Sequence, residues 1–290
     1  MALPWLVTRI DLRAGERIDA AMRERTSPSP TKRDTNKHGN SRVPALDDTP
    51  KTSGRRVRGA IFDYLGEMIV TGSVEVGDTL PGEVETAERL DISRGTYREA
   101  VKMLAGKGLV ESRPKTGTRV QERSRWNLLD PDVLRWAFAG RPDPSLVADL
   151  FEMRGVVEPA IARLAAARRD DEQAQRMREA LAIMAAKGLR SRSGRDADRL
   201  FHETLLEACG NEVMQSLGAS IGAAVAYTTL FKKRAGGLSR DPVPDHQRVM
   251  DAVEARDPDA AERAMAELLL LARQDTDRAL LDFTTPQNPA

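Results

Sequence analysis

The sequence has a single cysteine, no long apolar run and no excess of either charge. Cys209 alone excludes an internal disulfide framework and a thiolate zinc cluster, and it suits the reducing cytoplasm. No apolar stretch reaches the length that a bilayer requires. The apolar start Met1–Val7 is interrupted by Arg9 and Asp11 before the core of an export signal develops. We therefore expect a cytoplasmic protein without a membrane partner.

The overall charge does not indicate a nucleic-acid partner, but one segment is basic. The 290 residues carry 45 Lys and Arg against 44 Asp and Glu, a formal net charge of +1. Between Ser93 and Arg123, however, there are eight basic residues and three acidic ones. A local excess of this kind is the electrostatic footprint expected for a nucleic-acid contact.

Length and composition predict two folded domains behind a polar extension. A chain of 290 residues with 40% hydrophobic content can build two cores. Residues 26–54 are rich in Ser, Thr, Pro and charged residues and nearly lack large apolar side chains, which predicts disorder. The expected boundaries are a poorly ordered extension over 1–54, a first domain over 55–123, a connector over 124–142, a second domain over 143–283 and a flexible tail over 284–290.

The first domain has the pattern of a winged helix-turn-helix. Apolar residues recur at helical steps over Val57–Ile69, a short helical pattern covers Glu83–Leu90, and Ser93 can cap a third helix. Residues 109–120 then have the pattern of a basic hairpin, with Gly117 suited to a tight turn. Two short helices around a tight turn, with a helix before them and a hairpin after, form a DNA-binding architecture.

Short motifs in this domain resemble GntR-family transcription regulators. In chain order they are Leu80-Pro81-Gly82-Glu83, Ala87-Glu88-Arg89-Leu90, Ile92-Ser93-Arg94, Arg98-Glu99-Ala100, Leu104, Gly108-Leu109-Val110 and Gly117. The resemblance implies that the third helix and the wing tip contact double-stranded operator DNA through Ser93, Arg94, Thr96, Arg98, Lys115, Thr116 and Gly117. Many members carry an arginine directly after the Pro-x-Glu motif, where this chain has Val84. We therefore expect operator contacts that differ from the common pattern.

The second domain shows helical periodicity almost throughout. Glycine and proline breaks divide it into predicted helices over 145–168, 170–187, 195–209, 211–233, 243–255 and 258–282. The expected fold class is mainly α, with an N-terminal winged helix-turn-helix domain and a C-terminal all-α helical bundle. Asp198 and His202 are four residues apart and so share one helix face, and His246 lies on a later helix.

These three residues resemble the effector domain (FCD) of the FadR subfamily, whose metal-binding members use an Asp-x-x-x-His pair and two further histidines. Segments 126–136 and 157–163 also resemble the galactonate-operon repressor branch. The final histidine of the metal set is replaced by Leu268. Asp198, His202 and His246 could still hold zinc, manganese or nickel, or they could bind a small organic acid, of the aldonate type, without metal.

Two further cationic features bear on the effector site. Arg154 is the preferred anchor for the effector's carboxylate, by resemblance to the family, and an ion pair with Glu158 at helical spacing is the alternative. The run Lys232-Lys233-Arg234 is interpreted as charges that favour a helix C-terminus, with no binding role.

The leading hypothesis is a homodimeric, ligand-responsive transcription regulator, most simply a repressor of a sugar-acid operon and not an enzyme. Binding of an effector by Arg154, Asp198, His202 and His246 would shift the population between two conformations with different operator affinity. Two alternatives stay open. One is a metal-dependent hydrolase built on Asp198, His202 and His246, and the other is a constitutive DNA-binding protein with a purely structural dimerisation domain.

Overall fold

The computed structural model of the chain describes residues 52–113, 117–236 and 240–283, with side chains from residue 59 onward. The first 51 residues of the predicted extension and the predicted tail over 284–290 lie outside these ranges. Residues 52–54 belong to the first helix, so this helix begins slightly before Arg55. Within the described ranges no helix combines the length and the apolar composition needed to cross a bilayer.

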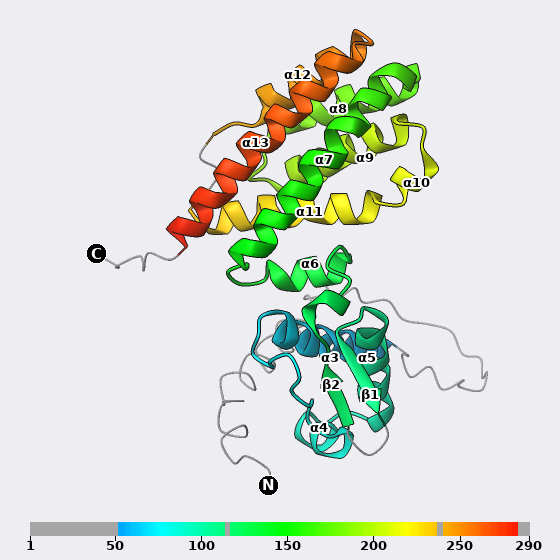
Figure 1. Cartoon of the computed structure of the whole chain (residues 1–290), viewed down its shortest axis with the longest axis vertical. Coiled ribbons are helices and arrows are strands. Elements are labelled where there is room, and N and C mark those ends of the chain that lie inside the picture. The colour runs from blue at the N-terminus through cyan, green and yellow to red at the C-terminus, as the bar shows by residue number, and fades with distance from the viewer. Residues whose placement is uncertain (1–51, 114–116, 237–239, 284–290) are drawn as a thin grey trace, which may run out of the picture. The chain divides into compact units, whose positions relative to one another are not determined.

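Three helices and a two-stranded hairpin make up the first part of the described chain (Figure 1). In order they are α3 (Thr52–Val70), α4 (Glu83–Arg89), α5 (Arg94–Gly106), β1 (Val110–Arg113) and β2 (Gly117–Val120). The strands are antiparallel, with Val110 opposite Val120 and Arg113 opposite Gly117. This is the winged helix-turn-helix that the sequence predicted.

A single apolar cluster holds the winged part together. It joins α3, α5 and the hairpin through buried side chains that include Ile61, Leu65, Leu104, Leu109 and Val120. Removing apolar surface of this kind from water contributes roughly 25 cal/mol for each Å² buried. The cluster therefore fixes α5 and the hairpin as neighbours that present their polar faces outward.

Gly108 is required at the turn between α5 and β1. Its φ is +75°, a region in which side chains other than glycine are strained. A Cβ at this position would also lie 2.1 Å from the carbonyl oxygen of Arg125. The close approach of Arg125, together with the positive φ, explains why this turn has a glycine.

The connector forms a short helix with contacts on both sides. After a 3-10 turn (η1, Arg123–Arg125), helix α6 spans Pro131–Ala137, and its Trp136 belongs to the apolar cluster of the winged part. An ideal Cβ on Gly66 of α3 would lie 2.4 Å from the Trp136 ring, so only glycine admits this indole. Leu134 and Phe138 belong instead to a cluster shared with the helices that follow.

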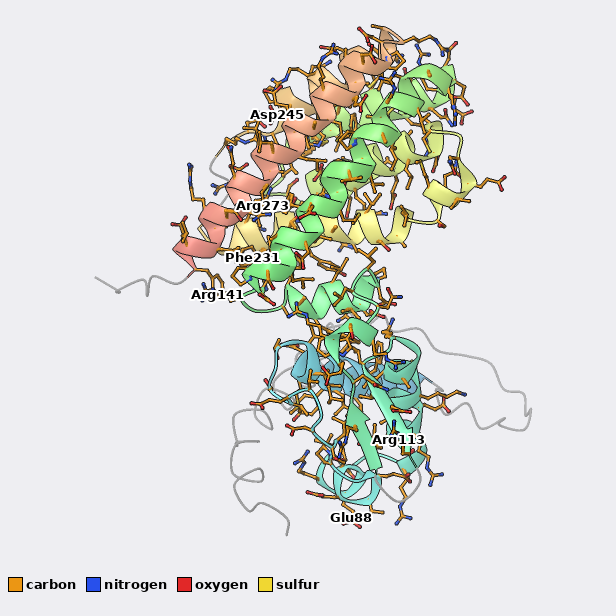
Figure 2. All side chains as sticks on the ribbon, viewed as in Figure 1. Glu88, Arg113, Arg141, Phe231, Asp245 and Arg273 are labelled. Carbon is orange, nitrogen blue, oxygen red and sulfur yellow. The ribbon has the colours of Figure 1, made fainter. Side chains whose placement is uncertain are left out.

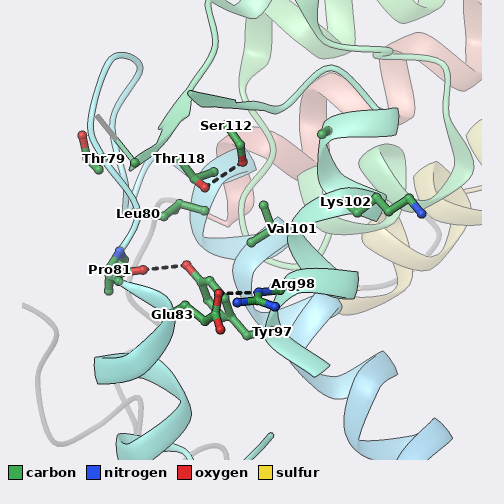
Figure 3. Close-up of a pocket in the computed structure, with 13 residues that line it drawn as sticks. Thr79, Leu80, Pro81, Glu83, Tyr97, Arg98, Val101, Lys102, Ser112 and Thr118 are labelled. Atoms are coloured by element: carbon green, nitrogen blue, oxygen red, sulfur yellow. Dashed lines mark hydrogen bonds and ion pairs between the residues drawn. The ribbon is translucent and has the colours of Figure 1, made fainter. Parts of the chain in front are cut away.

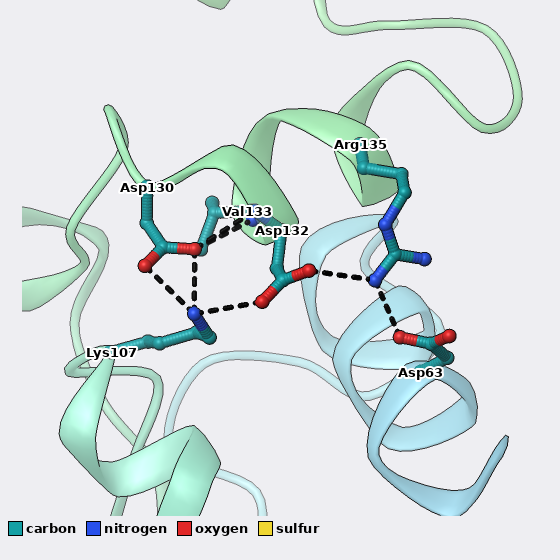
Figure 4. Close-up of polar contacts among 6 residues, drawn as sticks. All are labelled: Asp63, Lys107, Asp130, Asp132, Val133 and Arg135. Carbon is teal, nitrogen blue, oxygen red and sulfur yellow. Dashed lines mark hydrogen bonds and ion pairs between the residues drawn. The ribbon is translucent and has the colours of Figure 1, made fainter. Parts of the chain in front are cut away.

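A chain of charged side chains ties α6 to α3 and to the end of α5 (Figure 4). Asp130 caps α6 and accepts from Lys107 Nζ through both oxygens, at 2.7 Å each. Lys107 also lies 3.0 Å from Asp132, which bridges to Arg135 at 2.9 Å. Arg135 in turn lies 2.5 Å from Asp63 of α3. Because Lys107 is the C-cap of α5, its charge also favours that helix terminus.

The remaining chain is a helical bundle, as predicted. Its helices are α7 (Pro144–Arg168), α8 (Asp171–Lys187), α9 (Arg192–Ala208), α10 (Glu212–Gln215), α11 (Gly218–Arg234), α12 (Val243–Glu254) and α13 (Pro258–Asp282). The long helices α7 and α13 pack along one another, and α8 packs on α9 (Figure 1). Asp245 of α12, Phe231 of α11 and Arg273 of α13 are marked on this part in Figure 2.

The prediction of one helix over 211–233 was wrong, because the chain breaks into α10 and α11. The hydroxyl of Ser216 donates to the carbonyl of Val213 at 2.6 Å. The N–H of Leu217 bonds to Met214 O, three residues back, instead of continuing the four-residue α-helical pattern. A serine that competes for backbone partners ends a helix in this way, and α11 then starts at Gly218.

Candidate functional site

The polar face of α5 carries the residues expected to contact DNA. Ser93 caps the helix by accepting from the N–H of Thr96 at 3.1 Å, and its hydroxyl lies 2.9 Å from that of Thr96. Arg94 and Arg98 are exposed on this face. Among the described residues Arg94 forms no ion pair and no hydrogen bond to an acid, so its guanidinium is available to a partner.

A groove of about 590 Å³ runs beside α5 and the hairpin (Figure 3). On one wall the Tyr97 hydroxyl donates to the carbonyl of Pro81 at 2.6 Å, which fixes the loop before α4. On the rim Arg98 Nε lies 2.6 Å from Glu83 Oε2, while 70% of the Arg98 side chain stays exposed. An ion pair this exposed contributes only about 0.2 to 1 kcal/mol, so a phosphate or a base can replace Glu83 as the partner.

Part of the basic footprint is already neutralised within the protein. Lys107 is held by Asp130 and Asp132 with only 16% of its side chain exposed, whereas Arg113 and Arg123 form exposed pairs with Glu111 and Asp143 that DNA can replace. The surface expected for DNA is therefore narrower than the sequence count indicates. Gly117 starts β2 with φ at +84°, as its predicted turn requires, whereas Lys115 and Thr116 lie outside the described residues.

The bundle encloses a small polar cavity that unites the other predicted site residues. Its lining includes Arg154 of α7, Asp198 and His202 of α9, His246 of α12 and Leu268 of α13. All five are buried, with at most 4% of each residue exposed. The side chain at position 268 thus faces the same space as the aspartate and the two imidazoles, which is where the sequence placed the missing ligand.

The two imidazoles are oriented toward Asp198 by the hydrogen bonds that their other ring nitrogens make. His202 Nδ1 lies 3.0 Å from Glu158 Oε2, and His246 Nδ1 lies 2.9 Å from the carbonyl oxygen of Pro242. Both partners accept hydrogen bonds, so each neutral ring carries its proton on Nδ1. The Nε2 atoms then offer lone pairs toward Asp198 Oδ1, at 3.8 Å from His202 and 3.0 Å from His246.

Three acceptors therefore converge in a place without water contact. Asp198 Oδ1 and His246 Nε2 are buried and make no hydrogen bond within the described chain, although they are 3.0 Å apart. Unpaired buried acceptors are costly, and a proton or a cation between them would relieve the cost. The ligand atoms of Asp198, His202 and His246 all lie within 4.8 Å of one another.

This donor set fits a divalent transition metal. One carboxylate and two imidazoles are ordinary ligands of zinc, manganese or nickel, and the outward Nδ1 hydrogen bonds to Glu158 and Pro242 fix the rings as second-layer partners do in metal sites. Because Leu268, which lines the same cavity, offers no ligand atom, a bound metal would keep positions for water or for an anionic ligand.

The two buried carboxylates are held in the charged form. Burial alone would raise the pKa of Glu158, but the charge of Arg154 and the hydrogen bond from His202 outweigh it and hold the pKa at about 2. Burial would likewise raise the pKa of Asp198, but a proton between Asp198 and His246 gives a hydrogen bond and an imidazolium charge that, with the charges of His202 and Lys232, keep that pKa below its ordinary value. The cavity floor is therefore anionic, balanced by buried cations.

Arg154 forms the ion pair with Glu158 that was the alternative to an effector contact. Its Nε lies 2.5 Å from Glu158 Oε1, and both side chains are 3% exposed, so the pair is buried and not on a solvated surface. The guanidinium also packs over the Phe151 ring, 5.2 Å from its centre. Arg154 lines the cavity, but its charge is already matched.

Lys232 lies in the last turn of α11, as the sequence predicted, but its side chain is buried. Only 8% of the residue is exposed, and it lines the same cavity as Asp198 and His246. Burial lowers the pKa of its ammonium, partly opposed by Asp198 and Asp275. The spacing in the sequence indicates which helix face Lys232 shares. Lys232 follows Thr228 and Thr229 by one turn, and both threonines also line the cavity.

A winged helix-turn-helix followed by a helical bundle with a buried polar cavity defines a class of DNA-binding regulators. The chain belongs to the gntR family of bacterial regulatory proteins, whose model matches residues 58–120, and the FCD domain matches residues 149–271. Members of this family are transcription regulators and not enzymes, which confirms that prediction.

Similar proteins and structures agree with this assignment. The galactonate operon transcriptional repressor of Escherichia coli K12 is 35% identical over 208 residues, which cover 71% of this chain and 90% of the relative. The Uxu operon transcriptional regulator of the same organism is 28% identical over 241 residues, covering 80% and 90%. A solved structure of Lar, which controls expression of the Listeria monocytogenes agr system, shares the fold, with 14% identity, a TM-score of 0.53 and coverage of 77% of this chain and 97% of that one.

Proposed function

We propose that this regulator is a homodimeric repressor of an operon for the catabolism of a sugar acid or a related small organic acid, and that the acid releases it from operator DNA. The observation that carries the proposal is the buried cavity, in which Asp198 and His246 leave acceptors without hydrogen bonds beside buried cations. The buried cations favour an anionic ligand, and the free acceptors favour a ligand with hydroxyl groups that can donate to them. The named function of the galactonate relative supports the same ligand class.

The winged part, expected over 55–123, is proposed to bind the operator. Ser93, Arg94, Thr96 and Arg98 at the start of α5 would enter the major groove, and Lys115, Thr116 and Gly117 would contact the adjacent backbone from the wing. The exposed guanidinium of Arg94 and the weakly held one of Arg98 support this assignment. Two copies of the chain would place two such helices on a palindromic operator.

The bundle, expected over 143–283, is proposed to bind the effector and to dimerise. Arg154, Asp198, His202 and His246 form its inner wall, and a zinc, manganese or nickel ion on Asp198, His202 and His246 is the cofactor that their geometry would accept. For release to occur, the acid must bind the DNA-free conformation more tightly, because only differential affinity shifts a population.

The test uses the full-length protein and a duplex that the protein itself selects from a random DNA pool. Addition of galactonate, or of another aldonate or uronate, should lower duplex binding and raise the melting temperature. At an acid concentration 100 times Kd, the expected stabilisation is about 2.7 kcal/mol. Repeating the titration after chelation separates a metal-dependent site from a metal-free one. If no acid in the panel changes either measurement, the proposed function is wrong.

A further inference from the structure

The side chain of Lys232 lines the cavity and is not part of the exposed surface. It lies in the last turn of α11 (Gly218–Arg234), where its neighbour Lys233 is exposed while Lys232 itself is buried. Long side chains on a helix point back toward the residues three and four positions earlier. For Lys232 these are Thr229 and Thr228, which line the cavity with it. The ammonium and two hydroxyls thus belong to one wall.

Among the cations that line the cavity, Lys232 differs in its pairing. Arg154 is engaged by Glu158 through two contacts. Arg240 forms ion pairs with Asp245 and with Asp275, the latter at 2.9 Å. Within the described ranges no hydrogen bond or ion pair is formed by Lys232 Nζ, although Asp198 and Asp275 are near enough to favour its charge. A buried ammonium without a direct partner is costly.

The threonines beside Lys232 have hydrogen-bonding capacity to spare. The Thr228 hydroxyl donates to the carbonyl of Ala224 at 2.7 Å, which leaves its oxygen able to accept. Thr229 is buried and makes no hydrogen bond to another described residue through its hydroxyl. Across the cavity, Asp198 Oδ1 and His246 Nε2 can accept from hydroxyl groups. The cavity therefore places the Lys232 ammonium beside groups that can hydrogen-bond to the hydroxyls of a ligand.

We propose that Lys232 Nζ binds the carboxylate of the effector, and that Thr228 and Thr229 bind the hydroxyls next to it, so that the site selects hydroxylated monocarboxylates. The proposal rests on the proposed function, since it names the carboxylate anchor of that same cavity. It moves the anchor from Arg154, whose charge is matched by Glu158, to Lys232. A ligand carboxylate would supply the direct partner that Lys232 lacks.

The dimensions of the cavity agree with entry of a carboxylate first. Its volume of about 40 Å³ admits a small group and not a whole six-carbon acid. The rest of a six-carbon acid requires the wall to widen. Binding therefore favours a conformation other than this one, as release from DNA by population shift requires.

The experiment measures calorimetric affinities of the full-length protein for galactonate and for galactonamide, its neutral analogue with the same hydroxyl pattern. The variants are K232M, K232R and the matched control K233M, which changes the exposed neighbour. We expect K232M to lose at least tenfold in affinity for the acid, K232R to recover part of it and K233M to equal the wild type. Affinity for the amide should change little in any variant.

Distinct outcomes separate the possible failures. If the wild type binds galactonate and K232M binds it within twofold of the wild type, the carboxylate anchor is wrong while the proposed function stands. A K232M variant that loses affinity for acid and amide equally would likewise make Lys232 a structural residue. If neither galactonate nor any other aldonate or uronate binds the wild type, the proposed function and this inference both fail. K232Q replaces K232M if the latter does not fold.

Discussion

Asp198 Oδ1 and His246 Nε2 lie 3.0 Å apart without a hydrogen bond between them. The reason is chemical: Pro242 O takes the proton-bearing side of the imidazole, so two acceptors face one another. Asp198 Oδ1 also lies 3.8 Å from the second imidazole, that of His202. Such an arrangement is stabilised by a cation, and Leu268, which lines the same cavity, offers no fourth ligand atom.

Replacing Leu268 by histidine should therefore raise metal affinity. A fourth ligand closes the shell that Asp198, His202 and His246 begin, as in four-coordinate protein sites. We expect Leu268→His to bind zinc or nickel at least tenfold more tightly than the wild type, measured by competition with a chromophoric chelator. Leu270→His on the same helix is the control, because Leu270 is 58% exposed. Equal metal affinity in all three proteins would show that the three acceptors do not form a metal site.

Breaking the pair between Arg154 and Glu158 should strongly destabilise the bundle. Both side chains are 3% exposed, so removal of one leaves the other charge buried and unpaired. We expect Glu158→Gln to lower the free energy of unfolding by about 3 to 5 kcal/mol and the double change with Arg154→Met to cost less than the sum of the single changes. Denaturant unfolding measures both.

The control for this prediction is the pair Arg199 and Glu203, which has the same spacing on α9. Its side chains are 45% and 31% exposed, and their nitrogen and oxygen lie 2.5 Å apart. Glu203→Gln should cost no more than about 0.5 kcal/mol, because water screens an exposed pair. Similar losses for Glu158→Gln and Glu203→Gln would mean that burial does not set the strength of the inner pair.

Periodicity and motifs were sufficient to predict the winged helix-turn-helix, the bundle and the convergence of Asp198, His202 and His246. They could not show whether a charged side chain is buried or exposed once the chain is folded, or which residue it pairs with. Lys232 and Lys233 are adjacent and chemically identical, yet one is buried and the other exposed. That difference depends on which face of α11 packs on other helices, and pairing across helices is not encoded in a local charge run.

The same limit explains two other differences. Lys107 counted toward the basic footprint, but it is neutralised by Asp130 and Asp132, residues more than twenty positions later. The break between α10 and α11 depends on the Ser216 hydroxyl. A periodic pattern does not show whether this hydroxyl hydrogen-bonds to water or to a backbone carbonyl. Both features arise from contacts that form only once the chain is folded.

The charged chain around α6 should make stability depend on pH at both ends of the range. Burial would raise the pKa of Asp132, but hydrogen bonds from Arg135 and Lys107 hold it below 3.8. Burial would lower the pKa of Lys107, but Asp130 and Asp132 raise it above 10.5. A lowered acid stabilises above its unfolded pKa and is lost as pH falls, whereas a raised base stabilises below its unfolded pKa and is lost as pH rises.

The charged side chains around α6 therefore make their full contribution to the free energy of unfolding between about pH 3.8 and 10.5. Because 38% of the Asp132 side chain is exposed, we expect Asp132→Asn to lower the free energy of unfolding by no more than about 1 kcal/mol at pH 7. The loss should shrink as the pH falls below 3.8, measured by urea unfolding across pH. Asp196→Asn, which affects an exposed and distant acid, is the control. A loss that stays constant down to pH 2 would contradict an electrostatic role for Asp132.

Arg98 should carry a large part of operator affinity, and Glu83 should oppose it. Arg98→Ala is expected to weaken binding to the selected duplex by about 10- to 100-fold at 0.15 M salt, the value of about 1 to 3 kcal/mol for an arginine on guanine. Glu83→Ala releases the guanidinium from its 2.6 Å contact and should strengthen binding by up to about fivefold. In the Arg98→Ala background that gain should vanish, because Glu83 then has no guanidinium to hold. Arg141→Ala, an exposed change outside the winged part, should leave affinity unaltered. If gel shifts with Arg98→Ala match the wild type within twofold, α5 does not read the operator through this residue.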